Sequence, residues 1–265
     1  MAMKMDNKMD KKMTIRQIED SIKDLSLDKA LEALYILRED CKGKVEKIIE
    51  KYEKKKASYD RELDRYLNMC VYEKEAYDKG HKLIGGIDEA GRGPLAGPVV
   101  AACVILPKDI FIEGLNDSKK LSEKKRNELF DIIREKAIDI GVGIVDEKEI
   151  DEINILNAAK RAMKLAVDSL KNKPDILLID AERLEDVNIA QVSIIKGDTL
   201  SVSIAAASVI AKVTRDRILE EMDKTYPQYG FIKHKGYGTK EHIDSIKKYG
   251  ICPIHRMSFT KNFVV

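Results

Sequence analysis

The sequence predicts an α/β protein, in which a mixed β-sheet is flanked by helices, with a helical extension before it and a helical region after it. The first observation is that short, almost wholly apolar segments begin near residue 82 and then alternate with helical segments. The second is that residues 1–80 contain no proline and repeat apolar side chains at helical spacing. The third is that 44% of the 265 residues are apolar, which is enough to form a core.

Residues 1–69 are expected to form a separate helical domain. The stretch Thr14-Ile15-Arg16-Gln17 fits a capping box that opens a short helix, because its threonine and glutamine can both bond to backbone N–H groups. The longest helix of this domain should run from about Gly43 to about Met69. The domain is either a solvated appendage or an auxiliary grip on nucleic acid through four lysines: Lys51, Lys54, Lys55 and Lys56.

The second domain, residues 70–265, carries the predicted sheet and the C-terminal helical region. Five segments have the length and apolar character of strands: 82–87, 97–106, 139–145, 175–180 and 191–195. Apolar residues at helical spacing predict helices over 154–170, 203–221 and 239–249. Because consecutive strands precede the alternating helices and strands, the sheet should be mixed.

Composition excludes several classes of protein. The net charge is +2, from 48 basic and 46 acidic residues, so the chain is not uniformly basic. The cysteines show no CxxC pair or metal-finger spacing and are expected to be reduced thiols: Cys41, Cys70, Cys103 and Cys252. No apolar run reaches the ~18–20 residues that cross a bilayer, and the first residues, MAMKMDNKMDKKM, lack the apolar core of a secretory signal. We therefore expect a soluble, cytoplasmic protein with no membrane partner.

The densest chemical signal is the glycine-rich segment GGIDEAGRGPLAGPVV, residues 85–100. It contains adjacent carboxylates, Asp88 and Glu89, which would point to opposite faces of a regular strand. Both can serve one site only where the strand ends or bends, which Gly91 and Gly93 permit. An aspartate at a strand end is also a common turn residue, and this structural interpretation stays open here.

Two further carboxylates strengthen the case for a site. Asp180 closes the apolar strand 176–179, and Asp198 follows residues 194–197, at strand ends where open sheets bind ligands. Like charges ~4 Å apart repel by about 4 kcal/mol at an effective dielectric of ~20, so converging acids need protons or a divalent cation. An all-oxygen ligand set favours Mg²⁺ or Mn²⁺ over Zn²⁺ and is typical of two-metal phosphoryl chemistry.

Positive charge gathers near the C-terminus, where residues 224–265 contain eight Lys and Arg side chains against two acids. Interleaved aromatic rings are typical of a surface that binds phosphates, sugars or bases, although a solvated basic tail has the same composition. These rings belong to Tyr226, Tyr229, Phe231, Tyr237, Phe259 and Phe263. Further candidate substrate contacts, chosen as phosphate donors, are Asn116, Ser118, Lys119, Lys212 and Arg215.

Eight motifs occur in one order along residues 70–265: IDEAGRGPLAGPVV, LNDSKKLSEKKR, DEINILNA, LLIDA, KGD, AAASVIAKVTRDR, YPQYGFIKHKGYGT and HRMSF. Together they closely resemble bacterial ribonuclease HII, the type 2 ribonuclease H family. Residues 1–69 are similar to the helical extension of some members. The related ribonuclease HIII typically has lysine where Arg92 stands, so Gly91-Arg92-Gly93-Pro94 favours the HII type.

The resemblance implies a ribonuclease H-like fold and an endonuclease that cleaves the RNA strand of RNA–DNA hybrids. It also implies incision on the 5′ side of a single ribonucleotide in duplex DNA, leaving 3′-hydroxyl and 5′-phosphate ends, with two ions of Mg²⁺ or Mn²⁺ as cofactor. By motif, the catalytic and metal-binding residues are Asp88, Glu89, Asp180 and Asp198, with Asp216 as the remaining rival. The sequence does not identify a protein partner.

The turn Gly91-Arg92-Gly93, together with Tyr237, resembles the segment with which the family senses the ribonucleotide. A 2′-hydroxyl both donates and accepts hydrogen bonds, glycines let the backbone approach it, and a tyrosine ring can pack on the neighbouring deoxyribose. Arg92 would add positive charge near the scissile phosphate. Two alternatives remain: a non-catalytic binder of RNA–DNA hybrids, and a nuclease of the same fold that cleaves DNA.

Overall fold

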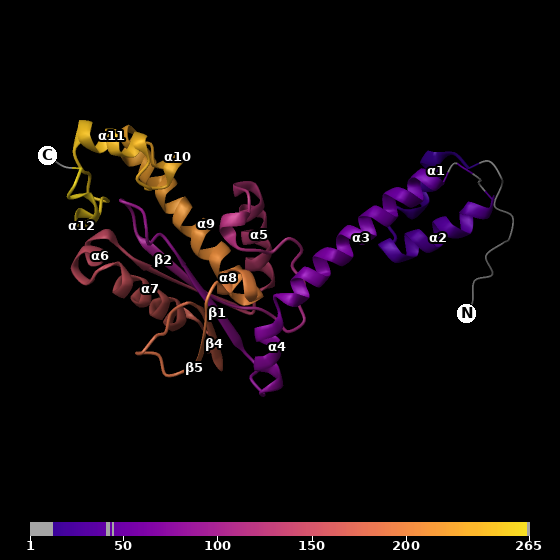
Figure 1. Cartoon of the computed structure of the whole chain (residues 1–265), viewed down its shortest axis with the longest axis horizontal. Coiled ribbons are helices and arrows are strands. Elements are labelled where there is room, and N and C mark those ends of the chain that lie inside the picture. Colours follow the sequence, from indigo (N-terminus) through magenta and orange to yellow (C-terminus); the bar gives the residue numbers. More distant parts are fainter. Residues whose placement is uncertain (1–12, 41–42, 44, 264–265) are drawn as a thin grey trace. The chain divides into compact units, whose positions relative to one another are not determined.

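This computed structural model describes residues 13–40, 43 and 45–263. The chain divides into two compact units, Met1–Arg65 and Tyr66–Val265 (Figure 1). The boundary falls four residues before the division at residue 69 that the sequence predicts. The N-terminal residues 1–12 and Cys41 lie outside the described residues. Within the described ranges, no helix combines the length and the apolar character that crossing a membrane requires.

The first unit is a group of helices with its own apolar core. In its described part the helices are α1 Ile15–Ile22, α2 Leu27–Asp40 and α3 Glu46–Asn68, the last of which continues past the boundary of the unit. The predicted capping box is confirmed: the Thr14 hydroxyl accepts a hydrogen bond from the Gln17 backbone, and the Gln17 side chain accepts one from the Thr14 N–H. Ile18, Leu34 and Ile49 are among the buried residues that hold these helices together.

The second unit is built on a five-stranded mixed sheet, as the sequence predicts. The strand order is β3-β2-β1-β4-β5, with the bounds β1 Ile84–Ala90, β2 Val99–Ile105, β3 Asp139–Val145, β4 Ile176–Asp180 and β5 Ala190–Ile194. The pairs β1–β2 and β2–β3 are antiparallel, whereas β1–β4 and β4–β5 are parallel. The strands β1 and β4 therefore end at the same edge of the sheet.

Helices cover both faces of this sheet (Figure 1). One face carries α9, Val202–Thr225, which packs on β1 and β2, and the other carries α7, Ile155–Ser169, which packs on β2 and β3. Glycines allow this close approach. A Cβ on Gly86 of β1 would lie 2.1 Å from the backbone carbon of Ser203, and one on Gly143 of β3 would lie 2.0 Å from the carbonyl oxygen of Ala162.

Shorter elements complete the second unit. They are α4 Val71–Asp78, α5 Glu123–Lys136, α6 Glu147–Ile153, α8 Gly197–Leu200, α10 Phe231–His234, α11 Lys240–Tyr249, α12 Met257–Thr260 and the 3₁₀ helices η1 Ser118–Lys120 and η2 Pro227–Tyr229. The predicted bounds of β3 are confirmed, while β1 and α9 end three and four residues later than predicted. The longer β1 results from pairing that continues to Ala90, opposite Val100.

The aromatic residues near the C-terminus contribute mainly to a core. Tyr229 and Phe231 are buried, stacked on each other with ring centroids 5.4 Å apart, and packed against histidine rings. They are therefore not available for stacking on bases, in contrast to the exposed aromatic surface that the composition suggests. Tyr237 differs, because 45% of it is exposed.

Candidate active site

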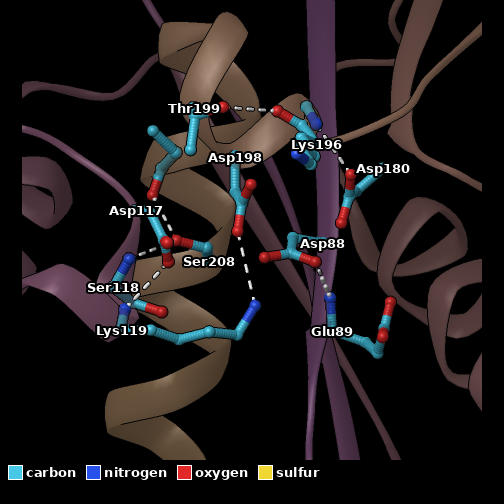
Figure 2. Close-up of polar contacts among 12 residues, drawn as sticks. Asp88, Glu89, Asp117, Ser118, Lys119, Asp180, Lys196, Asp198, Thr199 and Ser208 are labelled. Atoms are coloured by element: carbon cyan, nitrogen blue, oxygen red, sulfur yellow. Dashed lines mark hydrogen bonds and ion pairs between the residues drawn. The ribbon is translucent and has the colours of Figure 1, made fainter.

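Three carboxylates come together at the edge of the sheet where β1 and β4 end. Ile87 pairs with Ile179, so Asp88 and Asp180 follow at equivalent positions on neighbouring parallel strands. Asp198 lies in the short helix α8 that follows β5. Figure 2 shows the three carboxylates directed toward a common space, while the Glu89 side chain extends to one side. Three of the four acids that the sequence singles out thus lie around one space, whereas the side chain of Glu89 does not point into it.

Hydrogen bonds on either side of α8 hold Asp180 and position Asp198. The Gly197 N–H donates to Oδ1 of Asp180 over 2.7 Å, which ties the start of α8 to the end of β4. The hydroxyl of Ser201, the N-cap of α9, donates to the buried Glu73 over 2.5 Å. Because α8 lies between these two anchors, Asp198 is fixed in front of the strand ends.

Burial and repulsion by neighbouring acids raise the pKa values of Asp88 and Asp198. Asp88 is 3% exposed; burial raises its pKa well above the usual range, and the charges of Glu89 and Asp180 raise it further. Burial also raises the pKa of Asp198, with the nearby charge of Asp117 as the next cause. Ionised carboxylates in such a place require a compensating positive charge.

Two basic side chains already supply part of that charge. The Lys119 ammonium lies 3.4 Å from Oδ2 of Asp198. The Arg92 guanidinium lies 3.6 Å from Oε1 of Glu89 and 3.3 Å from Oε1 of Glu182. Sequence reasoning missed Glu182, although its position two residues beyond the end of β4 was a signal that it faces the same edge of the sheet.

The donor set fits a hard divalent cation, since every acidic ligand atom is a carboxylate oxygen. Among the described residues, no three His, Cys, Asp or Glu side chains are grouped closely enough to hold one ion by themselves. Mg²⁺ commonly takes one or two carboxylates and completes its shell with water and substrate phosphates, so pairs of acids suffice. The Lys119 ammonium beside Asp198 already places one positive charge at the site.

The GRG turn, residues 91–93, follows β1 and lies next to Tyr237. Gly91 adopts a φ of 101°, a conformation that favours glycine. A Cβ on Gly93 would lie 3.8 Å from Cε1 of Tyr237, in ordinary contact with the ring. The turn and the exposed tyrosine therefore form one continuous surface beside the carboxylates.

The other predicted substrate contacts occupy varied positions. Asn116 accepts a hydrogen bond from the Asp117 N–H through its side chain, and Ser118 is buried. Lys212 pairs with Asp216 at 2.7 Å and is itself largely buried, which lowers its pKa. The rival carboxylate Asp216 is therefore engaged by a lysine, whereas the ammonium of Lys119 lies 3.4 Å from Asp198 of the site.

Arg215 does not fit the predicted role of a phosphate contact. It is 1% exposed, and its guanidinium donates hydrogen bonds to the carbonyl oxygens of Ala96, Pro98 and Lys235. A phosphate has no access to this group, so the expected direct contact is corrected to an internal role. The burial was not visible in the sequence because Arg215 stands in a charge-rich helical stretch.

Two family descriptions match this chain: Ribonuclease HII over residues 85–262, and Ribonuclease HII N-terminal domain over residues 14–77. The chain is 72% identical over 253 residues to the ribonuclease HII of Acetivibrio thermocellus, covering 96% of this chain and 99% of that protein. It is 56% identical to the ribonuclease HII of Ruminiclostridium cellulolyticum, covering 95% of this chain and 98% of that protein.

A solved structure shares the fold as well. The ribonuclease H2 of Pyrococcus horikoshii OT3 superposes with a TM-score of 0.57 at 29% identity, covering 68% of this chain and 96% of the archaeal one. The family matches include both the glycine-rich segment and the carboxylates at the strand ends. This chain therefore belongs to the ribonuclease HII family and is a nuclease with ribonuclease H activity.

Proposed function

We propose that this enzyme cleaves the RNA strand of RNA–DNA hybrids and also incises duplex DNA on the 5′ side of a single embedded ribonucleotide. The products carry 3′-hydroxyl and 5′-phosphate ends. The observation that supports this proposal is that the carboxylates at the ends of β1 and β4 adjoin the GRG turn and Tyr237. One surface thus combines groups for phosphoryl chemistry with groups that can contact a sugar.

The proposed cofactor is a pair of divalent cations, Mg²⁺ or Mn²⁺. Asp88 and Asp180 would hold one ion, and two of the three acids Asp88, Glu89 and Asp198 would hold the other. When bound, such ions neutralise charge on the phosphodiester and make water a better nucleophile. Burial and the neighbouring acids raise the pKa of Asp88, and a cation bound beside this carboxyl group would lower it again by favouring the ionised form.

The protein side chains position the substrate and neutralise its charge. The Arg92 and Lys119 side chains are 43% and 74% exposed beside the carboxylates, where phosphate oxygens on either side of the scissile bond can reach them. These contributions are geometric and electrostatic, so no covalent intermediate is required. Water attacks the phosphorus and the bond from phosphorus to the 3′-oxygen breaks, so that oxygen leaves as the 3′-hydroxyl and the phosphate stays on the 5′ end.

The sugar is read by the GRG turn and Tyr237. Glycine backbone groups can approach the 2′-hydroxyl closely, and this hydroxyl is the chemical difference between ribose and deoxyribose. The half-exposed Tyr237 ring can pack on the next sugar, where a deoxyribose leaves room for it. Together these contacts favour binding of a strand at the point where a ribonucleotide is followed by a deoxyribonucleotide.

Cleavage-site mapping on a duplex with one ribonucleotide tests the proposal. With Mg²⁺ or Mn²⁺ we expect a single cut on the 5′ side of the ribonucleotide, no cut in the matching all-DNA duplex, and no cut after a chelator is added. Equal cleavage of the all-DNA duplex would identify a DNA nuclease of the same fold. Tight binding of the hybrid without any cut would support a binding protein instead.

A further inference from the structure

Among the described residues, the two largest fully buried side chains are Arg215 and Arg256, which are 1% and 0% exposed. All six hydrogen bonds that their guanidinium groups donate go to backbone carbonyl oxygens and none to a carboxylate. Burial lowers the pKa of Arg256 to about 9, so it keeps its charge at neutral pH. Because a buried charge is costly without a carboxylate partner, this arrangement calls for an explanation.

Arg256 donates hydrogen bonds to both ends of the segment that contains the GRG turn. Its Nη2 donates to the carbonyl oxygen of Gly91 over 2.6 Å, and its Nη1 to that of Arg92 over 3.0 Å. Its Nε donates to the carbonyl oxygen of Gly97 over 2.9 Å. One planar guanidinium therefore bonds to both ends of residues 91–97, which fixes the curvature of the turn.

Arg215 links the same segment to the chain before Tyr237. Its Nη2 donates to the carbonyl oxygen of Ala96 over 3.0 Å, and its Nη1 to that of Lys235 over 2.9 Å. The contact is close, since a Cβ on Gly236 would lie 2.5 Å from the Ala96 oxygen. Arg215 thus sets the distance between the two segments that carry the GRG turn and Tyr237.

We propose that Arg215 and Arg256 are positioning residues that hold the GRG turn and Tyr237 at the spacing required to distinguish ribose from deoxyribose. This inference rests on the proposed function of that surface. The reason is geometric: recognition of one hydroxyl depends on fits of a fraction of an ångström, and backbone loops do not keep such a spacing without side-chain support. Neither arginine donates a hydrogen bond to a carboxylate of the site, where Asp180 accepts its hydrogen bond from the Gly197 N–H instead.

Lysine substitutions test the inference with little change in charge. Arg215→Lys and Arg256→Lys keep a positive group but cannot reproduce three planar donors. Arg217→Lys is the matched control, because Arg217 stands on the same helix as Arg215, is exposed, and donates to the Asn127 side chain. For each protein we would measure kcat and KM on a duplex with one ribonucleotide, and cleavage of the matching all-DNA duplex in Mn²⁺. Calorimetry would give the affinity for Mn²⁺, and thermal unfolding would give Tm.

We expect Arg215→Lys and Arg256→Lys to lower kcat/KM on the ribonucleotide duplex by about a hundredfold. The ratio of kcat/KM on the ribonucleotide duplex to that on the all-DNA duplex should fall at least about tenfold. The affinity for Mn²⁺ should not change, and the Arg217→Lys control should behave like the wild type. Proportional loss on both substrates would indicate a purely structural role and overturn the inference. A wild-type enzyme without ribonucleotide preference would overturn the proposed function and the inference with it.

A second variant covers the case in which the lysine variants do not fold. Gly236→Ala leaves both arginines intact and forces the two segments apart, because the new Cβ meets the Ala96 carbonyl oxygen. It should reproduce the loss of ribonucleotide preference while Mn²⁺ affinity stays normal. Unchanged preference in a folded Gly236→Ala enzyme would show that the spacing of these segments does not control sugar recognition.

Discussion

Each carboxylate of the site is held by a different local contact. Asp88 is fixed by burial within β1, Asp180 by the Gly197 N–H, and Asp198 by its place at the start of α8 beside Lys119. The sequence could predict these acids because strand ends and an ordered set of motifs mark them. It could not predict the Glu182 contact, which depends on how a loop beyond β4 turns toward Arg92.

The substitution Asp180→Asn should separate catalysis from folding. The amide oxygen can still accept the Gly197 hydrogen bond, so we expect Tm to stay within the error of the wild-type value. Activity on the ribonucleotide duplex should fall about 10³-fold, because a charge that offsets the cations and phosphate is lost. Asp168→Asn, at an exposed aspartate of α7, serves as control. Near-normal turnover would remove Asp180 from the catalytic set.

At the scale of elements, the site depends on how closely α9 packs against β1. The sequence predicted both elements but placed their ends three and four residues too early, because strand pairing and helix burial extend them beyond their most apolar stretches. The amphipathic character of α5 was not recognised, since only a few buried residues, Leu129, Phe130 and Ile133, interrupt its charged sequence. The order of strands and helices along the chain predicted a mixed sheet, but it did not predict the strand order within the sheet.

Gly86→Ala should destabilise the second unit strongly. Its Cβ would overlap the Ser203 backbone at the start of α9, and overpacking of a core costs about 1–3 kcal/mol or more. Gly93→Ala is the matched comparison, because its Cβ meets only the Tyr237 ring at 3.8 Å. Chemical denaturation should show a lower unfolding free energy for Gly86→Ala alone. Equal stability of both variants would contradict the observed helix–strand contact.

A buried chain of hydrogen bonds near the C-terminus predicts a pH dependence of stability. His255 and His242 contact each other through their Nε2 atoms at 3.0 Å, and Nδ1 of His242 contacts the Tyr237 carbonyl oxygen at 2.9 Å. Burial lowers the pKa of both histidines to about 4. Because an unfolded histidine has a pKa of about 6.5, the unfolded chain binds more protons between these values.

The free energy of unfolding should therefore fall as the pH drops from about 6.5 to about 4, by up to about 1.4 kcal/mol per pH unit for each histidine. The double variant His242→Gln, His255→Gln should lack this contribution, and urea unfolding at several pH values would measure the difference. The site carboxylates contribute equally to both proteins and cancel. His81→Gln is the control. Parallel pH profiles for wild type and double variant would refute the expectation.

At the scale of the whole molecule, the net charge of +2 does not show which lysines are paired with acids and which are exposed. In the first unit Lys51 pairs with Glu19, and Lys56 pairs with Asp28 and Asp60, while Lys54 and Lys55 are exposed on α3. The sequence left open whether this unit is an appendage or an auxiliary grip, because composition does not reveal which lysines acids already engage. The family match to the N-terminal domain identifies the unit without assigning it a role.

The double variant Lys54→Ala, Lys55→Ala tests the auxiliary grip. If both lysines contact phosphates, the slope of log K against log salt concentration on duplex DNA should decrease in magnitude by about 1.8. Lys51→Ala, whose lysine is already paired with Glu19, serves as control. Fluorescence anisotropy across a salt series would measure the slopes. An unchanged slope and affinity would identify the first unit as an appendage with respect to duplex binding.

Arg92 stands between Glu89 and Glu182 and so shares its charge with two acids. A cation that binds Glu89 weakens the ion pair between Glu89 and Arg92, which leaves the guanidinium freer to bind a phosphodiester. A nucleic acid that takes Arg92 leaves Glu89 more negative and better able to bind a cation. By thermodynamic linkage each ligand then increases the affinity for the other by the same factor. If the proposed function holds, we expect heterotropic cooperativity between ion and duplex from this one shared arginine.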